Sequence, residues 1–134
     1  MDLPITSTMA ACLALLGLIL TIHISARRAM IGVKAGVIHK AVFGDTGDEM
    51  LRNSVRAFGN FIEYAPFAVV LIALMELQGA PATLLCWLGG AFVIGRIVHA
   101  FSMTFVPLVP APRGVAMFTT YAVFAVPAWW FLTN

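Results

Sequence analysis

The chain has 134 residues, of which 61% are hydrophobic and 10% are charged, and its mean hydropathy is +0.96. Because soluble domains carry about 25% charged residues, this composition excludes an ordinary soluble protein and predicts a single domain embedded in a lipid bilayer. The eight basic residues cannot form a phosphate-tracking surface on so apolar a chain, which argues against nucleic acid as a partner.

The charge pattern predicts four membrane-spanning helices. Residues 3–26, 77–95 and 114–134 contain no charged side chain, and each segment can cross about 30 Å of hydrocarbon at about 1.5 Å per residue. The segment 57–78 is equally apolar but contains three polar residues, Asn60, Glu63 and Glu76. The expected fold class is therefore an all-α membrane protein, a bundle of four transmembrane helices. The expected helices cover residues 4–28, 48–78, 81–106 and 112–132.

Prolines, glycines and a capping pattern indicate where these helices end. Pro4 suits a helix start, and the turn from Gly79 to Pro81 separates the second helix from the third. Thr46 is followed three residues later by Glu49, a capping-box pattern which predicts that the second helix starts in water. We expect residues 29–47 to form the one long linker.

All eight basic residues belong to one side of the expected bundle. They lie near the end of the first and third helices or near the start of the second and fourth: Arg27, Arg28, Lys34, Lys40, Arg52, Arg56, Arg96 and Arg113. The positive-inside rule assigns this side to the cytoplasm and both termini to the opposite side, where Trp87, Trp129 and Trp130 are expected at the interface.

The second helix carries a polar stripe. At about 100° per residue, Arg52, Arg56, Gly59, Asn60 and Glu63 project within an arc of roughly 100°. Charged side chains inside a span cost several kcal/mol unless they meet partners or water, so such a stripe indicates a structural or functional role.

The third helix adds Arg96 and His99, which are three residues apart and share a face. Together with the stripe they suit a small zwitterion, because arginines bind carboxylates bidentately, Glu63 can bind an ammonium group and Asn60 can bind an amide. The alternative interpretation is structural. Glu63 and Arg96 would then form a buried ion pair between helices, and the other arginines would anchor helix ends at the headgroups.

Other reactive side chains favour structural interpretations. His23 is expected to be a hydrogen-bonded core residue, with a haem ligated by His23 and His99 as the alternative. Cys12 and Cys86 lie in apolar runs and are interpreted as small buried residues, and no cluster of metal-ligating residues accompanies them. The glycine-bearing segment 89–95 predicts close helix packing.

Residues 56–66 read R-A-x-x-N-x-x-E-Y-x-P, which resembles the signature of the MAPEG family, the membrane-associated proteins of eicosanoid and glutathione metabolism. Residues 24–29 resemble the leukotriene C4 synthase branch, residues 95–99 resemble the family's third helix, and residues 44–49 resemble bacterial members. The resemblance covers nearly the whole chain. It implies a bacterial inner membrane protein that forms a homotrimer, with glutathione bound at the cytoplasmic end between neighbouring subunits.

Position by position, the resemblance implies a set of glutathione-binding residues: Arg56, Asn60, Glu63, Tyr64, Arg96 and His99, with Arg27 from the adjacent subunit. Arg113 resembles the arginine beside the glutathione sulfur, where a guanidinium would stabilise the nucleophilic thiolate. The implied activity is a glutathione transferase or peroxidase for detoxification, with glutathione as co-substrate and no metal. A hydrophobic second substrate would enter from the bilayer.

Three departures from the family leave alternatives open. Met103 stands where several eukaryotic members carry a tyrosine near the thiol, and Gly59 stands where the prostaglandin E synthase branch carries an arginine. Prolines prolong the loop from Val106 to Pro112, which leaves the exact placement of Arg113 open. A non-catalytic glutathione-binding or structural trimer is therefore one alternative. A small multidrug exporter is a weaker one, because such exporters place an essential glutamate in the first helix, which has no acid here between Asp2 and Arg27.

Overall fold

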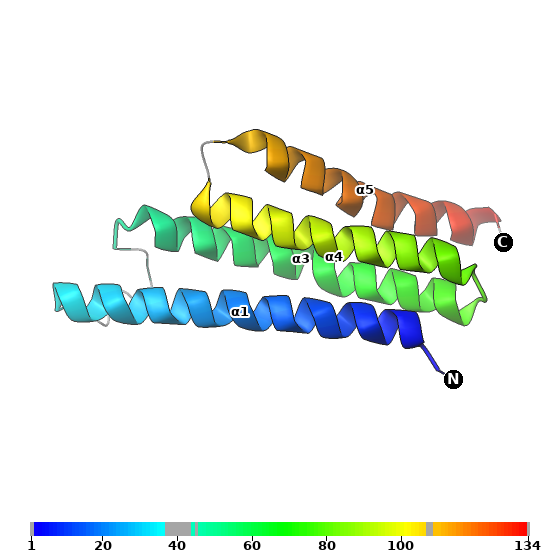
Figure 1. Cartoon of the computed structure of the whole chain (residues 1–134), viewed down its shortest axis with the longest axis horizontal. Helices are drawn as coiled ribbons and strands as arrows, with labels where there is room; N and C mark the ends of the chain where they lie inside the picture. The colour runs from blue at the N-terminus through cyan, green and yellow to red at the C-terminus, as the bar shows by residue number, and fades with distance from the viewer. Residues whose placement is uncertain (1, 37–43, 45, 107–108, 134) are drawn as a thin grey trace.

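The computed structural model describes residues 2–36, 44, 46–106 and 109–133. These residues form four α-helices and no strand: α1 (Pro4–Ala35), α3 (Glu49–Leu77), α4 (Ala82–Phe105) and α5 (Pro110–Thr133). The helices run side by side along one axis, with both ends of the chain at the same end of the bundle (Figure 1). All four are long and apolar enough to cross a membrane. The predicted all-α bundle with four potential spans is confirmed.

The largest difference from the expected helix ends is in α1. This helix continues past the expected end at residue 28 to Ala35, so the first part of the expected linker is helical. Residues 29–35 contain no proline, and the helix stops at Gly36, whose φ of 63° is left-handed and whose N–H donates to the carbonyls of Gly32 and Val33. Glycine takes this conformation without a Cβ penalty, which explains the position of the stop. Residues 37–43 and 45 lie outside the described residues.

The residue that caps α3 is Asp48, and the prediction of Thr46 as the cap was wrong. The Asp48 carboxylate accepts the backbone N–H of Leu51 at 2.7 Å. Thr46 has a φ of 51° and lies in the preceding turn. A carboxylate at the start of a helix satisfies an unpaired N–H and interacts favourably with the helix dipole, so Asp48 is the stronger cap.

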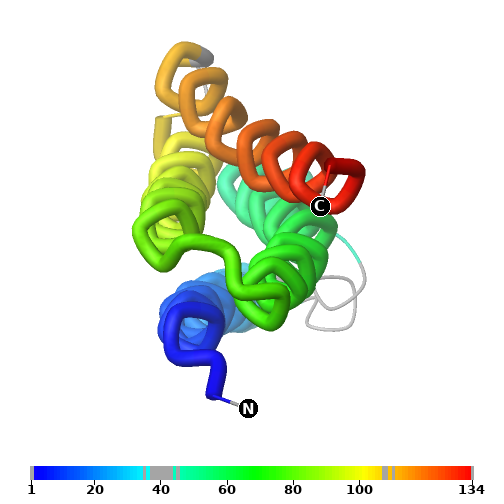
Figure 2. Tube along the Cα trace, turned by 90° about the vertical axis from the view of Figure 1, so that its right-hand side faces the viewer, coloured from blue at the N-terminus to red at the C-terminus, as the bar shows by residue number. Residues whose placement is uncertain are grey.

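Helices α3 and α4 form the centre of the bundle, and α1 and α5 lie on either side of this pair. Helices α3 and α4 pack against each other, α1 packs against both, and α5 packs against both on the opposite side, so that α1 and α5 do not touch within the described residues. Figure 2 shows this arrangement along the bundle, with α1 and α5 on opposite sides of the α3–α4 layer. The core between them includes Leu13, Phe61, Ile72, Phe92 and Val123.

Large apolar side chains also cover the outside of the bundle, as a lipid environment requires. Leu15, Phe118 and Trp87 are 62%, 68% and 75% exposed. Cys12 and Cys86 are exposed as well, so their expected burial was wrong. An apolar run in a membrane helix has no polar side to separate lipid-facing positions from core positions, and the sequence pattern therefore did not distinguish them.

Glu76 joins the ends of α1 and α3. Its carboxylate accepts the backbone N–H groups of Ile5 and Thr6 at 3.0 and 2.9 Å and the Thr6 hydroxyl at 2.6 Å. The residue at the N-cap of α1, Leu3, supplies no side-chain hydrogen bond. Glu76 therefore caps α1 from another helix, which gives this acidic residue a structural role.

Gly95 allows α4 and α5 to approach closely. A Cβ at this position would collide with the Thr119 side chain and would lie 3.2 Å from the Ala116 carbonyl oxygen. Gly89 also faces a neighbour, because a Cβ there would lie 3.3 Å from the Met9 sulfur, whereas Gly90 faces open space. The predicted close packing is confirmed at Gly95 and Gly89.

We expect Gly95→Ala to destabilise the bundle by about 1–3 kcal/mol, because the added methyl group must separate two packed helices. Gly90→Ala is the matched control, and it should be neutral or stabilising by up to about 1 kcal/mol through helix propensity. Unfolding of both variants in detergent measures the difference. Equal effects on the free energy of unfolding would show that the contact of α4 with α5 does not depend on Gly95.

Candidate functional site

The most unusual side chain in the spans is Arg96 of α4, which is 1% exposed. Its Nη1 donates to Asn60 Oδ1 of α3 at 2.9 Å, and its Nη2 lies 3.4 Å from the Met117 sulfur of α5. The guanidinium carbon lies 5.7 Å from the centre of the Tyr64 ring and 5.4 Å from the centre of the Phe92 ring. Three helices therefore surround one guanidinium with an amide, a thioether and two aromatic rings.

Within the described residues, this guanidinium has no acidic partner. Arg96 forms no ion pair with any residue that the structure describes, and its Nε is buried without a hydrogen-bond acceptor. The alternative interpretation of a Glu63–Arg96 ion pair is not realised within the protomer, because Glu63 is exposed. A buried cation without an anion is strongly unfavourable unless a ligand or partner compensates it.

His99 and Arg113 extend the polar cluster toward the start of α5. His99 lies one turn beyond Arg96 on α4 and is 4% exposed, while Arg113 lies in the first turn of α5 and is half-buried. His99 is within electrostatic reach of both arginines. The cluster around Arg96 thus includes four of the eight predicted site residues, Asn60, Tyr64, Arg96 and His99, and Arg113 lies beside it.

Arg56 and Glu63 are not part of this cluster. Both side chains are exposed on α3, and neither makes a hydrogen bond or an ion pair with another described residue. Asn60 lies between them along the helix and is half-buried against α4. The polar stripe of α3 therefore runs along the border between the bundle interior and the protomer surface.

Arg27, predicted as a glutathione contact from a neighbouring subunit, is held by its own chain. Its Nε and Nη2 donate to the two carboxylate oxygens of Asp48 at 3.2 and 2.7 Å. This bidentate pair links the last third of α1 to the start of α3. Chiefly because of the hydrogen bonds from Arg27, and despite an opposing effect of burial, the pKa of Asp48 lies below its usual value.

The lowered pKa of Asp48 predicts an acid-sensitive connection between α1 and α3. A carboxyl group whose pKa is lower in the folded state contributes stability above its unfolded pKa, and this contribution is lost as the pH falls through the folded pKa. We expect Asp48→Asn to remove that acid-dependent part of the stability while retaining an N-cap side chain. Unfolding measured across the acidic range tests this, and an unchanged acid dependence in the variant would refute it.

His23 has a local structural partner. Its Nε2 lies 3.1 Å from the Ser54 hydroxyl oxygen, and its ring packs edge-on against Phe105 with centroids 5.5 Å apart. The predicted hydrogen bond of His23 is confirmed, but its side chain is half-buried and lines a groove between α1 and α4 instead of lying in the core. Within the described residues, no group of three or more His, Cys, Asp or Glu side chains could hold a metal ion.

Phe92 and Met117 are contacts of Arg96 that the sequence analysis did not single out. Phe92 lies one turn before Arg96 on the same helix, so helical spacing was an available signal for it. Met117 belongs to α5, and its contact with Arg96 depends on how α4 and α5 pack. No spacing in the sequence predicts that contact.

The fold and this cluster define an integral membrane protein of four helices with an arginine site buried between three of them. The profile of the MAPEG family matches residues 6–133. The chain belongs to the MAPEG family.

Two curated relatives are similar over part of the chain. The inner membrane protein YecN of Escherichia coli strain K12 is 32% identical over 69 residues, which cover 52% of this chain and 53% of YecN. YecN of Escherichia coli strain O6:H1 matches to the same extent. The chain spans about half the length of these relatives. No solved structure matches it.

Proposed function

We propose that this protein is a membrane-bound glutathione transferase or peroxidase that ionises the glutathione thiol and directs it at lipophilic electrophiles or hydroperoxides. The observation that carries the proposal is the buried Arg96, which has an amide and two aromatic rings around it but no carboxylate partner among the described residues. Glutathione brings two carboxylates, and a charge-assisted hydrogen bond to one of them would compensate this cation.

The remaining polar groups of the site match the rest of glutathione. The side-chain amide of Asn60 can form hydrogen bonds with a peptide group of glutathione. Its Oδ1 now accepts a hydrogen bond from Arg96, so this oxygen would either leave Arg96 or accept from both groups. Glu63 is exposed and makes no ion pair with another residue that the structure describes, which makes it available to the ammonium group. Arg56 precedes Asn60 by one turn and is available to the second carboxylate.

We propose a homotrimer in which glutathione lies between neighbouring subunits. Arg56 and Glu63 support this, because both are exposed charged residues in a potential span and neither forms an ion pair within the described part of the protomer. Charged side chains at membrane depth normally face a partner or water. Arg27 would take part from the adjacent subunit, and it would then exchange or share its Asp48 contact.

The proposed location is the inner membrane, with the basic end of the bundle in the cytoplasm. YecN, the partial relative, is named an inner membrane protein. The basic residues of the described chain lie toward the end of the bundle opposite the two termini, and the positive-inside rule places such residues in the cytoplasm.

In the proposed chemistry, Arg113 stabilises the sulfur anion. A free thiol ionises near pH 8.5, and a nearby guanidinium favours its ionised form. The proton leaves to solvent, and the sulfur forms a bond to an electrophilic carbon while the leaving group departs with its electrons. With a hydroperoxide, two glutathione molecules are oxidised to the disulfide while the hydroperoxide is reduced to the alcohol and water.

Turnover with glutathione and either chlorodinitrobenzene or cumene hydroperoxide tests the proposal. We expect Arg113→Ala to lower kcat by about tenfold to a hundredfold while changing glutathione affinity much less, because it acts on the reacting sulfur. Lys34→Ala, an exposed change on α1, is the control and should match wild type. Equal losses of kcat and affinity would make Arg113 a binding residue. Glutathione binding without turnover would favour the non-catalytic alternative.

A further inference from the structure

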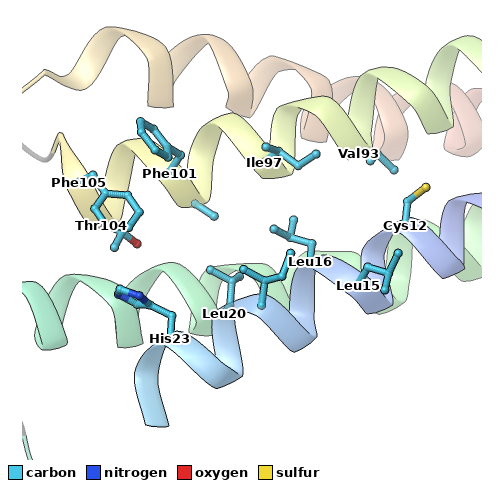
Figure 3. Close-up of a pocket in the computed structure, with 12 residues that line it drawn as sticks. Cys12, Leu15, Leu16, Leu20, His23, Val93, Ile97, Phe101, Thr104 and Phe105 are labelled. Carbon is cyan, nitrogen blue, oxygen red and sulfur yellow. The ribbon is translucent and has the colours of Figure 1, made fainter. Parts of the chain in front are cut away.

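A cavity lies on the side of α4 that faces α1, away from the Arg96 cluster. It is a groove of about 470 Å³ between these two helices, within the size range of small-molecule sites. The walls are almost entirely apolar and include Leu16, Leu20 and Ile97 (Figure 3). Along α1 the groove extends from Cys12 to His23, which at 1.5 Å per residue is about 16 Å. This shape suits an extended alkyl chain.

One end of the groove is polar. Thr104 is 4% exposed, and its hydroxyl oxygen is buried without a hydrogen-bond partner. A threonine in a helix can bond the carbonyl one turn earlier, and Thr104 makes no such bond. Figure 3 shows its hydroxyl pointing toward α1, where His23 faces it across the groove.

The hydrogen bonds of His23 determine which of its ring nitrogens can accept a hydrogen bond from a ligand in the groove. The Ser54 hydroxyl donates its one proton to the Met50 carbonyl at 2.7 Å, so the 3.1 Å contact with His23 requires His23 Nε2 to be the donor. In the neutral ring, Nδ1 is then an acceptor. His23 and Thr104 both line this end of the groove, which therefore combines a ring that has an acceptor nitrogen with a hydroxyl that can donate.

We propose that the α1–α4 groove binds a neutral lipophilic alcohol, with its alkyl chain against the apolar walls and its hydroxyl between His23 and Thr104. The hydroxyl of the ligand donates to His23 Nδ1 and accepts from Thr104, which satisfies the buried Thr104 oxygen. None of the described residues that line the groove carries a formal charge, so a fatty acid anion would lack a cation. The site is separate from the Arg96 cluster and does not depend on the proposed function.

Binding of radiolabelled dodecanol to the purified full chain, without glutathione, tests the proposal. We expect saturable binding that Thr104→Val weakens by roughly fivefold to tenfold, since one hydrogen bond to the ligand is lost while the side-chain shape is retained. Thr120→Val is the matched control, because Thr120 also has a buried hydroxyl without a partner but lies on α5 outside the groove. Ile97→Trp, which fills the groove from an exposed position, should abolish binding.

Competition identifies the source of the hydroxyl group. Displacement by glycerol monolaurate as well as by unlabelled dodecanol would support a lipid headgroup as the natural ligand, and displacement by dodecanol alone would support a free alcohol. Equal competition by dodecane, or unchanged affinity in Thr104→Val, would overturn the proposal because the hydroxyl would not be recognised. It would also be overturned if Ile97→Trp changed the oligomeric mass, since the groove would then be an interface between copies of the chain.

Discussion

Arg96→Met should reduce glutathione affinity by about thirtyfold to a thousandfold, which corresponds to about 2–4 kcal/mol for losing a buried charge-assisted contact. The same change should leave the free energy of unfolding of the ligand-free protein unchanged or increased. The reason is that Arg96 has no acidic partner among the described residues, and methionine replaces an uncompensated buried cation with an apolar chain. Equilibrium dialysis and unfolding in detergent measure the two effects.

Lower glutathione affinity without a loss of stability would distinguish a ligand-binding role of Arg96 from a structural role. An arginine that stabilises the bundle would lose stability and binding together when it is replaced. Lys34→Met provides a control for removing a positive charge from an exposed position, and it should change neither quantity. Wild-type affinity in Arg96→Met would exclude Arg96 from the glutathione site.

Glu76→Ala should destabilise the bundle by about 2–4 kcal/mol, because three charge-assisted hydrogen bonds to the first turn of α1 are lost together. Hydrogen exchange should become faster in that turn first. Glutathione affinity should remain unchanged, since Glu76 lies at the other end of α3 from Arg56.

A double-mutant cycle with Thr6→Ala provides the control for Glu76. Thr6 contributes both a backbone N–H and a hydroxyl to the same carboxylate. The two substitutions should therefore be less destabilising together than the sum of their separate effects. Additive effects would show that Glu76 stabilises the protein through other contacts.

The fold was predictable from sequence because the distribution of charges marks the spans and the turns. The absence of charge in residues 3–26 and 77–95 places two helices directly. The sequence pattern at the start of α3 did not identify the capping residue. Thr46 and Asp48 both precede α3, and only the structure shows that Asp48, held by Arg27, is the cap.

The site was predictable only in part. The spacing of Arg96 and His99 placed them on one face, and both are buried there. The pairing of Arg96 with Asn60 and the contact with Met117 depend on the packing of three helices, which no local pattern contains. Glu76 is a similar case, because its partners lie 70 and 71 residues away in the sequence.

The central claim is that this protein binds glutathione and ionises its thiol, and titration followed by the ultraviolet absorbance of the thiolate tests it most directly. The purified wild-type protein is titrated with glutathione at neutral pH, with S-methylglutathione as the control that cannot form a thiolate. We expect a saturable thiolate signal with glutathione and none with the methylated compound. The absence of any glutathione binding would contradict the account and leave the polar residues around Arg96 without their proposed ligand.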